Sequence, residues 1–264
     1  MIKVKIRKPI SRKKYLLLAA AAFLTVFLVW SAVSSAGMVK EIFLPRPSSV
    51  LRYYLTAVSD GTLWENTKIS IIRISLGFLM AVVLGIPVGI LVGTFAKTEA
   101  AVRPLCEFIR YMPVPAFVPL IMVWIGIGES AKVAVIFIGT FFQLVLMVAD
   151  DALSVPGDLI NAGYTLGADT KQAVFRILIP AMMPRLMETL RMMIGWAWTY
   201  LVSAELVAAD TGLGYTILKS QRFLKTDAIF GGILLIGLLG LVTDRIFALL
   251  NKKLFPWAKG GRQV

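Results

Sequence analysis

Long apolar runs separated by short polar segments dominate the chain. A helix that crosses a membrane needs about 20 mostly apolar residues. The predicted spans cover residues 15–37, 73–95, 105–127, 133–151, 186–209 and 228–250. Pro113 and Pro115 are expected to break the third span, because proline removes a helical hydrogen bond. A polar loop is expected at 40–68, with a short surface helix at 48–57, and a second loop at 210–227.

The longest stretch of the second half that does not suit a membrane is residues 152–185, between the fourth and fifth predicted spans. Leu159, Ala162 and Leu166 recur in it at helical spacing. Gly167 comes directly after Leu166. Glycine commonly ends a helix because it tolerates the left-handed conformation. The pattern predicts a short amphipathic helix that ends at this glycine.

A second short helix is predicted directly after the glycine. Asp169 is followed three residues later by Gln172, which is the acidic form of a capping box. Val174 and Ile177 then supply an apolar side, and Pro180 is expected to end the helix. The segment is therefore predicted to be a helix–glycine–helix unit between two membrane spans.

Composition fixes the class of protein. Of the 264 residues 58% are hydrophobic and the mean hydropathy is +0.80, whereas a soluble domain is about 45–50% apolar. The chain is predicted to be one integral membrane domain, residues 15–250, with a basic tail at 1–14 and a second tail at 251–264. Residues 15–39 carry no charge, which is too long a run for an ordinary signal peptide, and an uncleaved first span is expected although Ser34, Ser35 and Ala36 resemble a cleavage site.

The formal charge of +13 reflects topology rather than nucleic-acid binding, because Lys and Arg gather at the ends of the predicted spans. The loops on the side of both termini hold 16 of these residues and the opposite loops hold 8. By the positive-inside rule, both termini and the 152–185 segment are predicted to be cytoplasmic.

Several kinds of chemistry are excluded. The chain has no histidine, and its single cysteine, Cys106, cannot form an intramolecular disulfide or a cysteine cluster for a metal. A phosphate-binding loop requires Gly-x4-Gly-Lys-Ser/Thr. The nearest approach ends in Lys219-Ser220, but Leu218 stands where the second glycine belongs. No catalytic or metal residue is expected, and any ATP hydrolysis requires a separate chain.

The order Asn161-Ala162-Gly163, Gly167, Ile177 and Ile179-Pro180 resembles the cytoplasmic "EAA" loop of ABC importer permeases, which reads Glu-Ala-Ala, Gly and Ile-x-Leu-Pro at the same spacings. The chain departs from that pattern at Asn161, Gly163 and Ile179. Residues 44–51, 118–132 and 204–217 are similar to the nitrate, sulfonate and taurine branch of the family. The resemblance covers roughly residues 40–257.

The resemblance implies an all-α, six-helix permease of the type I importer class, with a cytoplasmic coupling helix between spans four and five. The expected partners are two ABC ATPase subunits that hold ATP and Mg²⁺, a second permease copy forming a homodimer, a periplasmic or lipid-anchored binding protein, and bacterial inner-membrane lipid. No nucleic acid and no cofactor on this chain are expected. The residues assigned to the ATPase contact are Asn161, Ala162, Gly163, Gly167, Ala168, Asp169, Lys171, Phe175, Arg176, Ile177 and Pro180. The implied cargo is a nitrate, sulfonate, taurine or bicarbonate.

Five residues are candidates for the translocation path: Gln143, Arg191, Trp196, Tyr200 and Glu205. Glu205 is charged within the fifth predicted span. It either lines the outer gate or path, or pairs as an interfacial acid with an Arg or Lys of the outer loop. Gln143, Trp196 and Tyr200 either point polar groups inward or serve in packing. For Arg191, snorkelling to lipid headgroups is favoured over a path contact.

Arg73 and Arg110 are interpreted in the same way as Arg191. The sequence places no basic residue well inside the membrane, which argues against an intramembrane anion site. On the second span, small residues recur every four or eight positions and predict a close helix contact; they are Gly77, Gly85, Gly89 and Gly93.

Two other classes of protein compete with the permease. A self-contained secondary transporter or channel needs an ion site or filter within the membrane. Only Glu205 and the Pro113/Pro115 break offer such a feature. A membrane-embedded enzyme needs a nucleophile with a base, or metal ligands, and the lack of histidine disfavours it.

Overall fold

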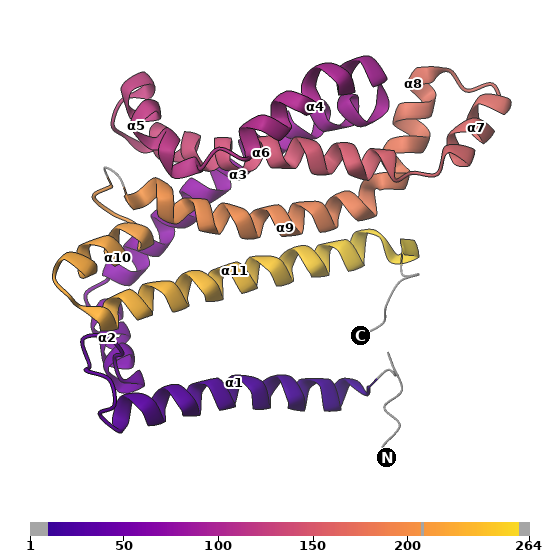
Figure 1. Ribbon diagram of the computed structural model, residues 1–264. Coiled ribbons are helices and arrows are strands. Elements are labelled where there is room, and N and C mark those ends of the chain that lie inside the picture. Colours follow the sequence, from indigo (N-terminus) through magenta and orange to yellow (C-terminus); the bar gives the residue numbers. More distant parts are fainter. Residues whose placement is uncertain (1–9, 207–208, 259–264) are drawn as a thin grey trace.

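The computed structural model describes residues 10–206 and 209–258. The parts of the two predicted tails at 1–9 and 259–264, and residues 207–208 of the fifth predicted span, lie outside that description. All regular elements of the described chain are helices (Figure 1). They are α1 (Arg12–Ser35), α2 (Pro47–Ser59), α3 (Thr62–Thr94), α4 (Ala96–Arg110), α5 (Val114–Ile125), α6 (Glu129–Leu153), α7 (Gly157–Thr165), α8 (Thr170–Gln172), a π-helix (Ala173–Leu178), α9 (Ile179–Leu206), α10 (Leu213–Arg222), α11 (Thr226–Leu254) and a 3-10 turn (Pro256–Ala258).

Four described helices are long and apolar enough to cross a membrane, namely α1, α3, α6 and α11. The predicted third span is two helices, α4 and α5, which meet at 102° around the expected proline break. Counted as one broken span, this pair brings the number to five. Helix α9 has 28 residues, or about 42 Å at 1.5 Å per residue, but carries charges along its first half. Six spans therefore stay a prediction.

Two helices begin well before the predicted spans. Helix α4 starts at Ala96 rather than 105, and α3 starts at Thr62 rather than 73, so the predicted polar loop ends earlier than expected. Asp60 accepts from the backbone N–H and the hydroxyl of Thr62 at 3.0 and 2.6 Å, just ahead of α3. These bonds hold the pKa of the Asp60 carboxyl below its ordinary value. The surface helix expected at 48–57 is confirmed as α2.

The most extensive contact between two helices of the described chain joins α3 to α6. A Cβ on Gly89 would lie 2.6 Å from the Cβ of Val148, and one on Gly93 would lie 2.5 Å from the carbonyl oxygen of Ala149. Gly77 and Gly85 face α6 in the same way, at 2.8 Å from Ile136 and 3.2 Å from Leu144. The close helix contact predicted from the glycine spacing is confirmed, and its partner is α6.

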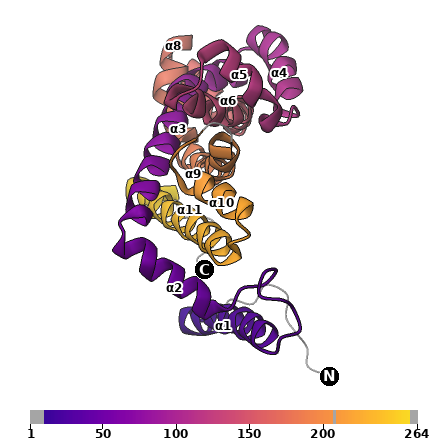
Figure 2. The ribbon, with the colours of Figure 1, turned by 90° about the vertical axis from the view of Figure 1, so that its left-hand side faces the viewer.

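Helix α1 stands apart from the bundle. Figure 2 shows it at one edge, with α4 and α5 at the opposite edge. Its contact with the rest of the chain lies near its C-terminal end, where Trp30 stacks on Phe230 at 5.9 Å and donates to the carbonyl oxygen of Pro45 at 3.0 Å. Most of its apolar side chains are exposed; Phe23 is 78% exposed. Such a surface suits contact with lipid or another chain rather than water.

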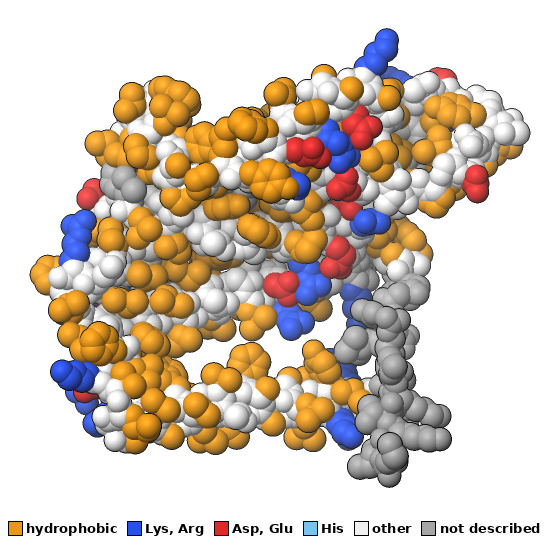
Figure 3. Space-filling model, in the orientation of Figure 1, with side chains coloured by type: hydrophobic (Ala, Val, Ile, Leu, Met, Phe, Trp, Pro, Cys, Tyr) orange, Lys and Arg blue, Asp and Glu red, His pale blue; other side chains and the backbone are white. Residues whose placement is uncertain are grey.

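Charged side chains lie mainly near the ends of the helices. In Figure 3 the charged side chains gather in a band toward the right and in a smaller group at the left edge, with apolar surface between them. The start of α1, the end of α11 and the α7–α8 unit all lie toward the right in Figure 1. The three segments that were predicted to share one side of the membrane thus lie at one end of the molecule.

Candidate functional site

The turn between α7 and α8 has the conformation that its glycine predicts. Gly167 has a φ of +86°, in the left-handed region. Its N–H donates to Tyr164 O at 2.9 Å, and the N–H of Ala168 donates to Gly163 O at 3.0 Å. These two bonds form a Schellman motif, which satisfies carbonyl groups at the end of α7. The predicted closure of the first helix at Gly167 is confirmed.

The second helix of this unit begins with the predicted capping box. The carboxylate of Asp169 accepts from the N–H of Gln172 at 2.7 Å, and the side chain of Gln172 accepts from the N–H of Asp169 at 3.2 Å. Two backbone groups at the helix start are thereby satisfied by local residues alone. A signal contained in four consecutive residues was sufficient to predict this geometry.

The expected stop at Pro180 is wrong. The chain stays helical from Thr170 through the π-helix and into α9, with Pro180 as its second residue. In the wider π turn the N–H of Ile179 donates to Val174 O, five residues back. Proline normally clashes with the carbonyl four residues before it. The π-helix shifts the bonding register directly ahead of Pro180, so the proline is accommodated within one continuous helix.

The two departures from the family pattern that lie on α7 have different surroundings. Gly163 packs against Ile177 of the π-helix so closely that an added Cβ would overlap the Ile177 side chain. This contact folds α7 back against the second helix, and it accounts for glycine at this position. Asn161 is exposed.

The outer surface of this projecting loop (157–180) is partly apolar. Leu166 is 88% and Phe175 63% exposed, and Leu159 is 46% exposed. The helical spacing of Leu159, Ala162 and Leu166 therefore marks an outward face rather than a packed one. Of the residues assigned to the ATPase contact, those on this exposed surface are Asn161, Ala162, Gly167, Asp169, Lys171, Phe175, Arg176 and Pro180, while Gly163, Ala168 and Ile177 lie behind it.

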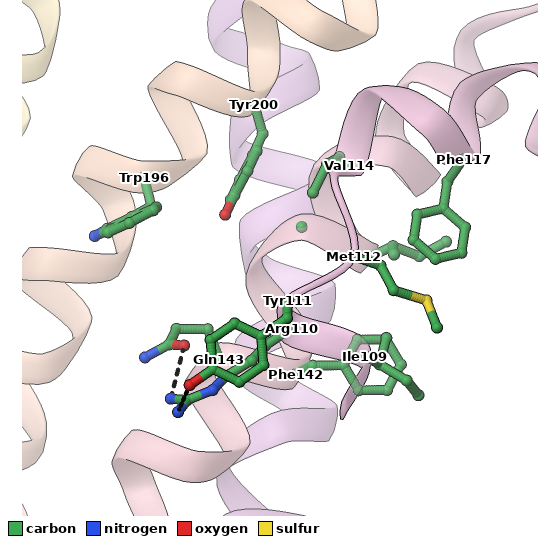
Figure 4. Close-up of a pocket in the computed structure, with 12 residues that line it drawn as sticks. Ile109, Arg110, Tyr111, Met112, Val114, Phe117, Phe142, Gln143, Trp196 and Tyr200 are labelled. Carbon is green, nitrogen blue, oxygen red and sulfur yellow. Dashed lines mark hydrogen bonds between the residues drawn. The ribbon is translucent and has the colours of Figure 1, made fainter. Parts of the chain in front are cut away.

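A cavity of about 350 Å³ lies beside the bend between α4 and α5. Three predicted path residues line it together: Gln143 from α6, and Trp196 and Tyr200 from α9 (Figure 4). Tyr200 points into the cavity from the side opposite the bend. The remaining lining residues are Ile109, Arg110, Tyr111, Met112, Val114, Phe117, Ile138, Gly139 and Phe142.

Arg110 supplies the charge of this cavity. Its Nη1 donates to Gln143 Oε1 at 3.5 Å and its Nη2 donates to the Tyr111 hydroxyl at 3.0 Å. The guanidinium also lies over the Tyr111 ring, 4.8 Å from its centroid, a favourable cation–π arrangement. Sequence analysis interpreted Arg110 as a snorkelling residue; the structure instead turns it toward Gln143 at the cavity.

Glu205, the fourth path candidate, lies away from this cavity in a buried ionic cluster. Its side chain is fully buried, and Arg73 of α3 donates to it at 2.7 Å. Arg73, itself 1% exposed, also donates to both carboxylate oxygens of Glu129 at 2.6 Å. Lys132 donates to Glu129 at 2.8 Å. The two buried cations, Arg73 and Lys132, are thus balanced by the buried Glu205 and by Glu129, whose side chain is 55% exposed.

This cluster corrects two expectations. A well-buried basic residue exists, Arg73, but acidic side chains already occupy it. Glu205 has a basic partner, as one of its two interpretations required, but that partner lies on α3 rather than in the outer loop. A role for Glu205 in the path stays a prediction.

The predicted loop at 210–227 contains a helix, α10, whose start is bound by the same cluster. The N–H groups of Gly212, Leu213 and Gly214 donate to Asn66 Oδ1, Ser70 Oγ and Glu205 Oε2 at 2.7, 2.9 and 2.7 Å. Side-chain oxygens thus satisfy the open donors of the helix start, where a negative charge is also favoured. Three hydrogen bonds thus hold the backbone of Gly212, Leu213 and Gly214 in place.

Arg191, the fifth path candidate, forms a clamp between two helices. Its Nε and Nη2 donate to the two carboxylate oxygens of Asp244 on α11 at 2.6 and 2.9 Å. Glu188, one turn earlier on α9, accepts from its Nη1 at 3.3 Å. The favoured interpretation of a snorkelling side chain is wrong, because the guanidinium binds a carboxylate bidentately, which is the strong form of this pairing.

A family model described as the binding-protein-dependent transport system inner membrane component matches residues 85–256. The chain belongs to this family. Its permeases are membrane components of binding-protein-dependent ABC importers, and the transport role and the type I importer fold implied by the EAA-like loop are thereby confirmed. The membrane location is confirmed as that of a multi-pass inner-membrane component.

Relatives in this family match nearly the whole chain. The taurine transport system permease protein TauC of Escherichia coli (strain K12) is 33% identical over 97% of this chain and 94% of its own length. The putative aliphatic sulfonates transport permease protein SsuC of Bacillus subtilis (strain 168) is 31% identical over 96% and 92%. The bicarbonate transport system permease protein CmpB of Synechocystis (strain PCC 6803) is 31% identical over 87% and 85%.

Solved structures agree on the fold. The permease chain from inward-facing conformations of the MetNI methionine ABC transporter superposes with a TM-score of 0.57 at 23% identity, covering 71% of this chain and 94% of that chain. At this level of identity the likeness concerns the arrangement of helices alone.

Proposed function

We propose that this permease subunit imports a small oxyanion of the sulfonate or bicarbonate class, nitrate included, by alternating access driven by ATP hydrolysis on a separate ATPase subunit. The observation that carries the proposal is the cavity beside the α4–α5 bend, where Arg110 presents a positive charge among polar and aromatic side chains. The names of three similar permeases, which refer to taurine, aliphatic sulfonates and bicarbonate, point to the same chemistry.

The projecting loop is proposed as the contact with the ATPase. Leu166 and Phe175 expose apolar side chains at the end of the molecule, with Lys171 and Arg176 beside them. An exposed helical unit with apolar anchors suits docking in a groove of a partner. Because the second helix of the loop continues into α9 without a break, a tilt of the loop would move α9 and the aromatic wall of the cavity. ATP and Mg²⁺ would be held by two ATPase subunits and not by this chain.

A second copy of the chain is proposed to close the cavity. Arg110 and Tyr111 are exposed in the single chain, and Trp196 is 54% exposed. A charged residue among membrane helices normally faces a water-filled path or a partner rather than lipid. A two-fold partner on this face would enclose the path, since symmetric pairs present the same surface to each other. A homodimer is the simplest such assembly.

The orientation follows from the distribution of positive charge. The termini and the projecting loop are proposed to be cytoplasmic, on the side of the ATPase. A periplasmic or lipid-anchored binding protein would then dock at the opposite end, which carries α2 and α10. Their exposed basic residues, Arg52 on α2 and Arg222 on α10, are available to such a partner.

The test is ATPase stimulation in liposomes. The chain is reconstituted with the ATPase subunit of its own transport system, and the matching binding protein is added, loaded with taurine, an alkanesulfonate, bicarbonate or nitrate. We expect one loaded binding protein to stimulate hydrolysis, and Gly167→Asp to abolish the stimulation. Gly167 is exposed at the turn of the projecting loop, so an aspartate there adds a negative charge to the proposed contact surface.

Two outcomes contradict the proposal. Stimulation that is equal with loaded and empty binding protein for all four solutes would reject the oxyanion class. Stimulation that survives in Gly167→Asp would reject the projecting loop as the coupling contact.

A further inference from the structure

We propose that Arg110 binds the anionic headgroup of the transported solute inside the membrane, and is thus the residue that selects for negative charge. This inference rests on the proposed function and names the residue that performs its central step. The sequence motifs and the family pattern did not assign it.

Arg110 differs from the other arginines on the membrane helices in what it contacts. Across the described residues, four of the others lie within 4 Å of a carboxylate: Arg73 with Glu129 and Glu205, Arg103 with Glu99 and Asp150, Arg185 with Asp151, and Arg191 with Asp244 and Glu188. Like Arg12 at the start of α1 and Arg245 on α11, Arg110 has no ion-pair partner among the described residues, and of these three arginines Arg110 is the one that lines the cavity. Its positive charge is therefore not neutralised within the described chain.

The neutral neighbours position Arg110 but accept hydrogen bonds from only some of its N–H groups. Gln143 and the Tyr111 hydroxyl each accept one of its N–H groups (Figure 4). A guanidinium carries five N–H donors. About three of the five thus stay open for a ligand. The ring of Tyr111 lies against the guanidinium plane and restricts its orientation.

Arg110 lies deep among the membrane helices, where a charge without an ion-pair partner indicates a function. Its partner Gln143 lies ten residues from the end of α6 at Leu153 and fourteen from its start at Glu129, which corresponds to about 15 and 21 Å of helix. Arg110 thus reaches the middle of a membrane-crossing helix. Charge at such depth is costly, so it is retained where a path or ligand uses it.

The cavity has the size and walls for a small anion. Its volume of about 350 Å³ falls at the lower end of ordinary ligand pockets. The planar guanidinium fork matches the paired oxygens of sulfonate, carboxylate, carbonate and nitrate groups. Tyr200 and Trp196 form the facing wall on α9 and bring a hydroxyl and an indole N–H. These features fit an oxyanion headgroup with a short apolar or polar tail.

The experiment measures ATP-driven uptake of taurine, ethanesulfonate and bicarbonate by the complete reconstituted complex. The variants are Arg110→Gln, Arg110→Lys and Gln143→Glu, with Lys13→Gln as the control that removes one charge from the exposed start of α1. Gln143→Glu keeps Arg110 but places a carboxylate beside it, and an added ion pair does not threaten folding. ATPase stimulation by the loaded binding protein reports assembly in every variant.

We expect Arg110→Gln and Gln143→Glu to lower uptake by about tenfold or more, the change that corresponds to losing one charged contact. Stimulated ATP hydrolysis should persist, Arg110→Lys should retain part of the uptake, and Lys13→Gln should match wild type. Uptake by Arg110→Gln or Gln143→Glu at wild-type rate and half-saturation would overturn this inference alone. A wild-type complex that imports none of these three solutes and no nitrate would overturn the proposed function and, with it, this inference.

Discussion

The guanidinium of Arg73 on α3 donates to the carboxylate of Glu205 on α9 at 2.7 Å, and the two side chains are 1% and 0% exposed. Glu205 also accepts from the Ser70 hydroxyl and from the N–H of Gly214, each at 2.7 Å. One buried carboxylate thus joins α3 and α9 to the start of α10. The acid within the fifth predicted span thus has a structural role in this cluster.

Replacing Glu205 with Gln should destabilise the protein. The substitution removes one of the two acids that balance Arg73 and Lys132, and breaking a buried pair costs about 3–5 kcal/mol. An amide nitrogen would also oppose the N–H of Gly214, which needs an acceptor. Thermal unfolding of the purified complex should occur at a lower temperature. Glu65→Gln, at an exposed carboxylate in the first turn of α3, is the matched control, and equal melting temperatures for the two variants would refute the role of the cluster.

Gly212→Ala should disturb the same region through sterics alone. Gly212 has a φ of +124°, and an added Cβ would lie 2.5 Å from the carboxylate of Glu205. Strain in the backbone and the clash together should cost about 1–3 kcal/mol. Gly237→Ala on α11, where no atom lies within 4 Å of an added Cβ, should be neutral or slightly stabilising. A Gly212→Ala protein that melts like Gly237→Ala would contradict the arrangement of Glu205 and α10.

Gly89→Ala tests the contact between α3 and α6. The added Cβ would lie 2.6 Å from the Cβ of Val148 and 2.8 Å from the carbonyl oxygen of Val145, and neither atom can swing away. Overpacking of this kind costs about 1–3 kcal/mol. We expect a lower melting temperature and reduced yield of the assembled complex. Gly195→Ala on α9 has open space around it and should leave both values unchanged; a loss in both variants would point to another cause.

Substitutions at Gly167 distinguish the effect of backbone strain on coupling from the effect of side-chain size. Alanine is strained at a φ of +86°, whereas asparagine tolerates the left-handed region better. An added Cβ meets no atom within 4 Å here, so bulk alone has no effect inside the chain. Gly167→Ala should therefore reduce stimulated ATP hydrolysis more than Gly167→Asn does. The reverse order would mean that contact size, and not turn geometry, governs coupling.

Local signals in the sequence predicted local structure well. The glycine turn at Gly167 and the capping box of Asp169 and Gln172 each depend on a few neighbouring residues, and both are confirmed. The recurrence of Gly77 and Gly89 predicted a close contact, but the spacing does not reveal that the partner is α6. The prediction that the helix ends at Pro180 is wrong because a π-helix precedes this proline and removes the usual clash with a backbone carbonyl. The π-helix itself has no clear sequence signal.

The contacts of three arginines could not be predicted from the sequence, because these contacts join residues that are far apart in the chain. Arg73, Arg110 and Arg191 look alike in sequence, since each is a lone arginine in an apolar surrounding. Two of them bind acids on distant helices, Glu205 and Asp244. Arg110 meets only neutral groups because the break at Pro113 turns α5 away by 102° and opens a cavity beside α6. The prolines that follow Arg110 signalled the break, but the angle of the break is a tertiary property.

The central claim is that this permease moves an oxyanion at the expense of ATP hydrolysed by a partner chain. The most direct test follows labelled solute into liposomes that contain the complete complex and a loaded binding protein, with ATP present or absent and with ion gradients either intact or dissipated by ionophores. The account predicts accumulation that requires both ATP and the binding protein and continues after the gradients are dissipated. Uptake by this chain alone, driven by an ion gradient and indifferent to ATP, would contradict it.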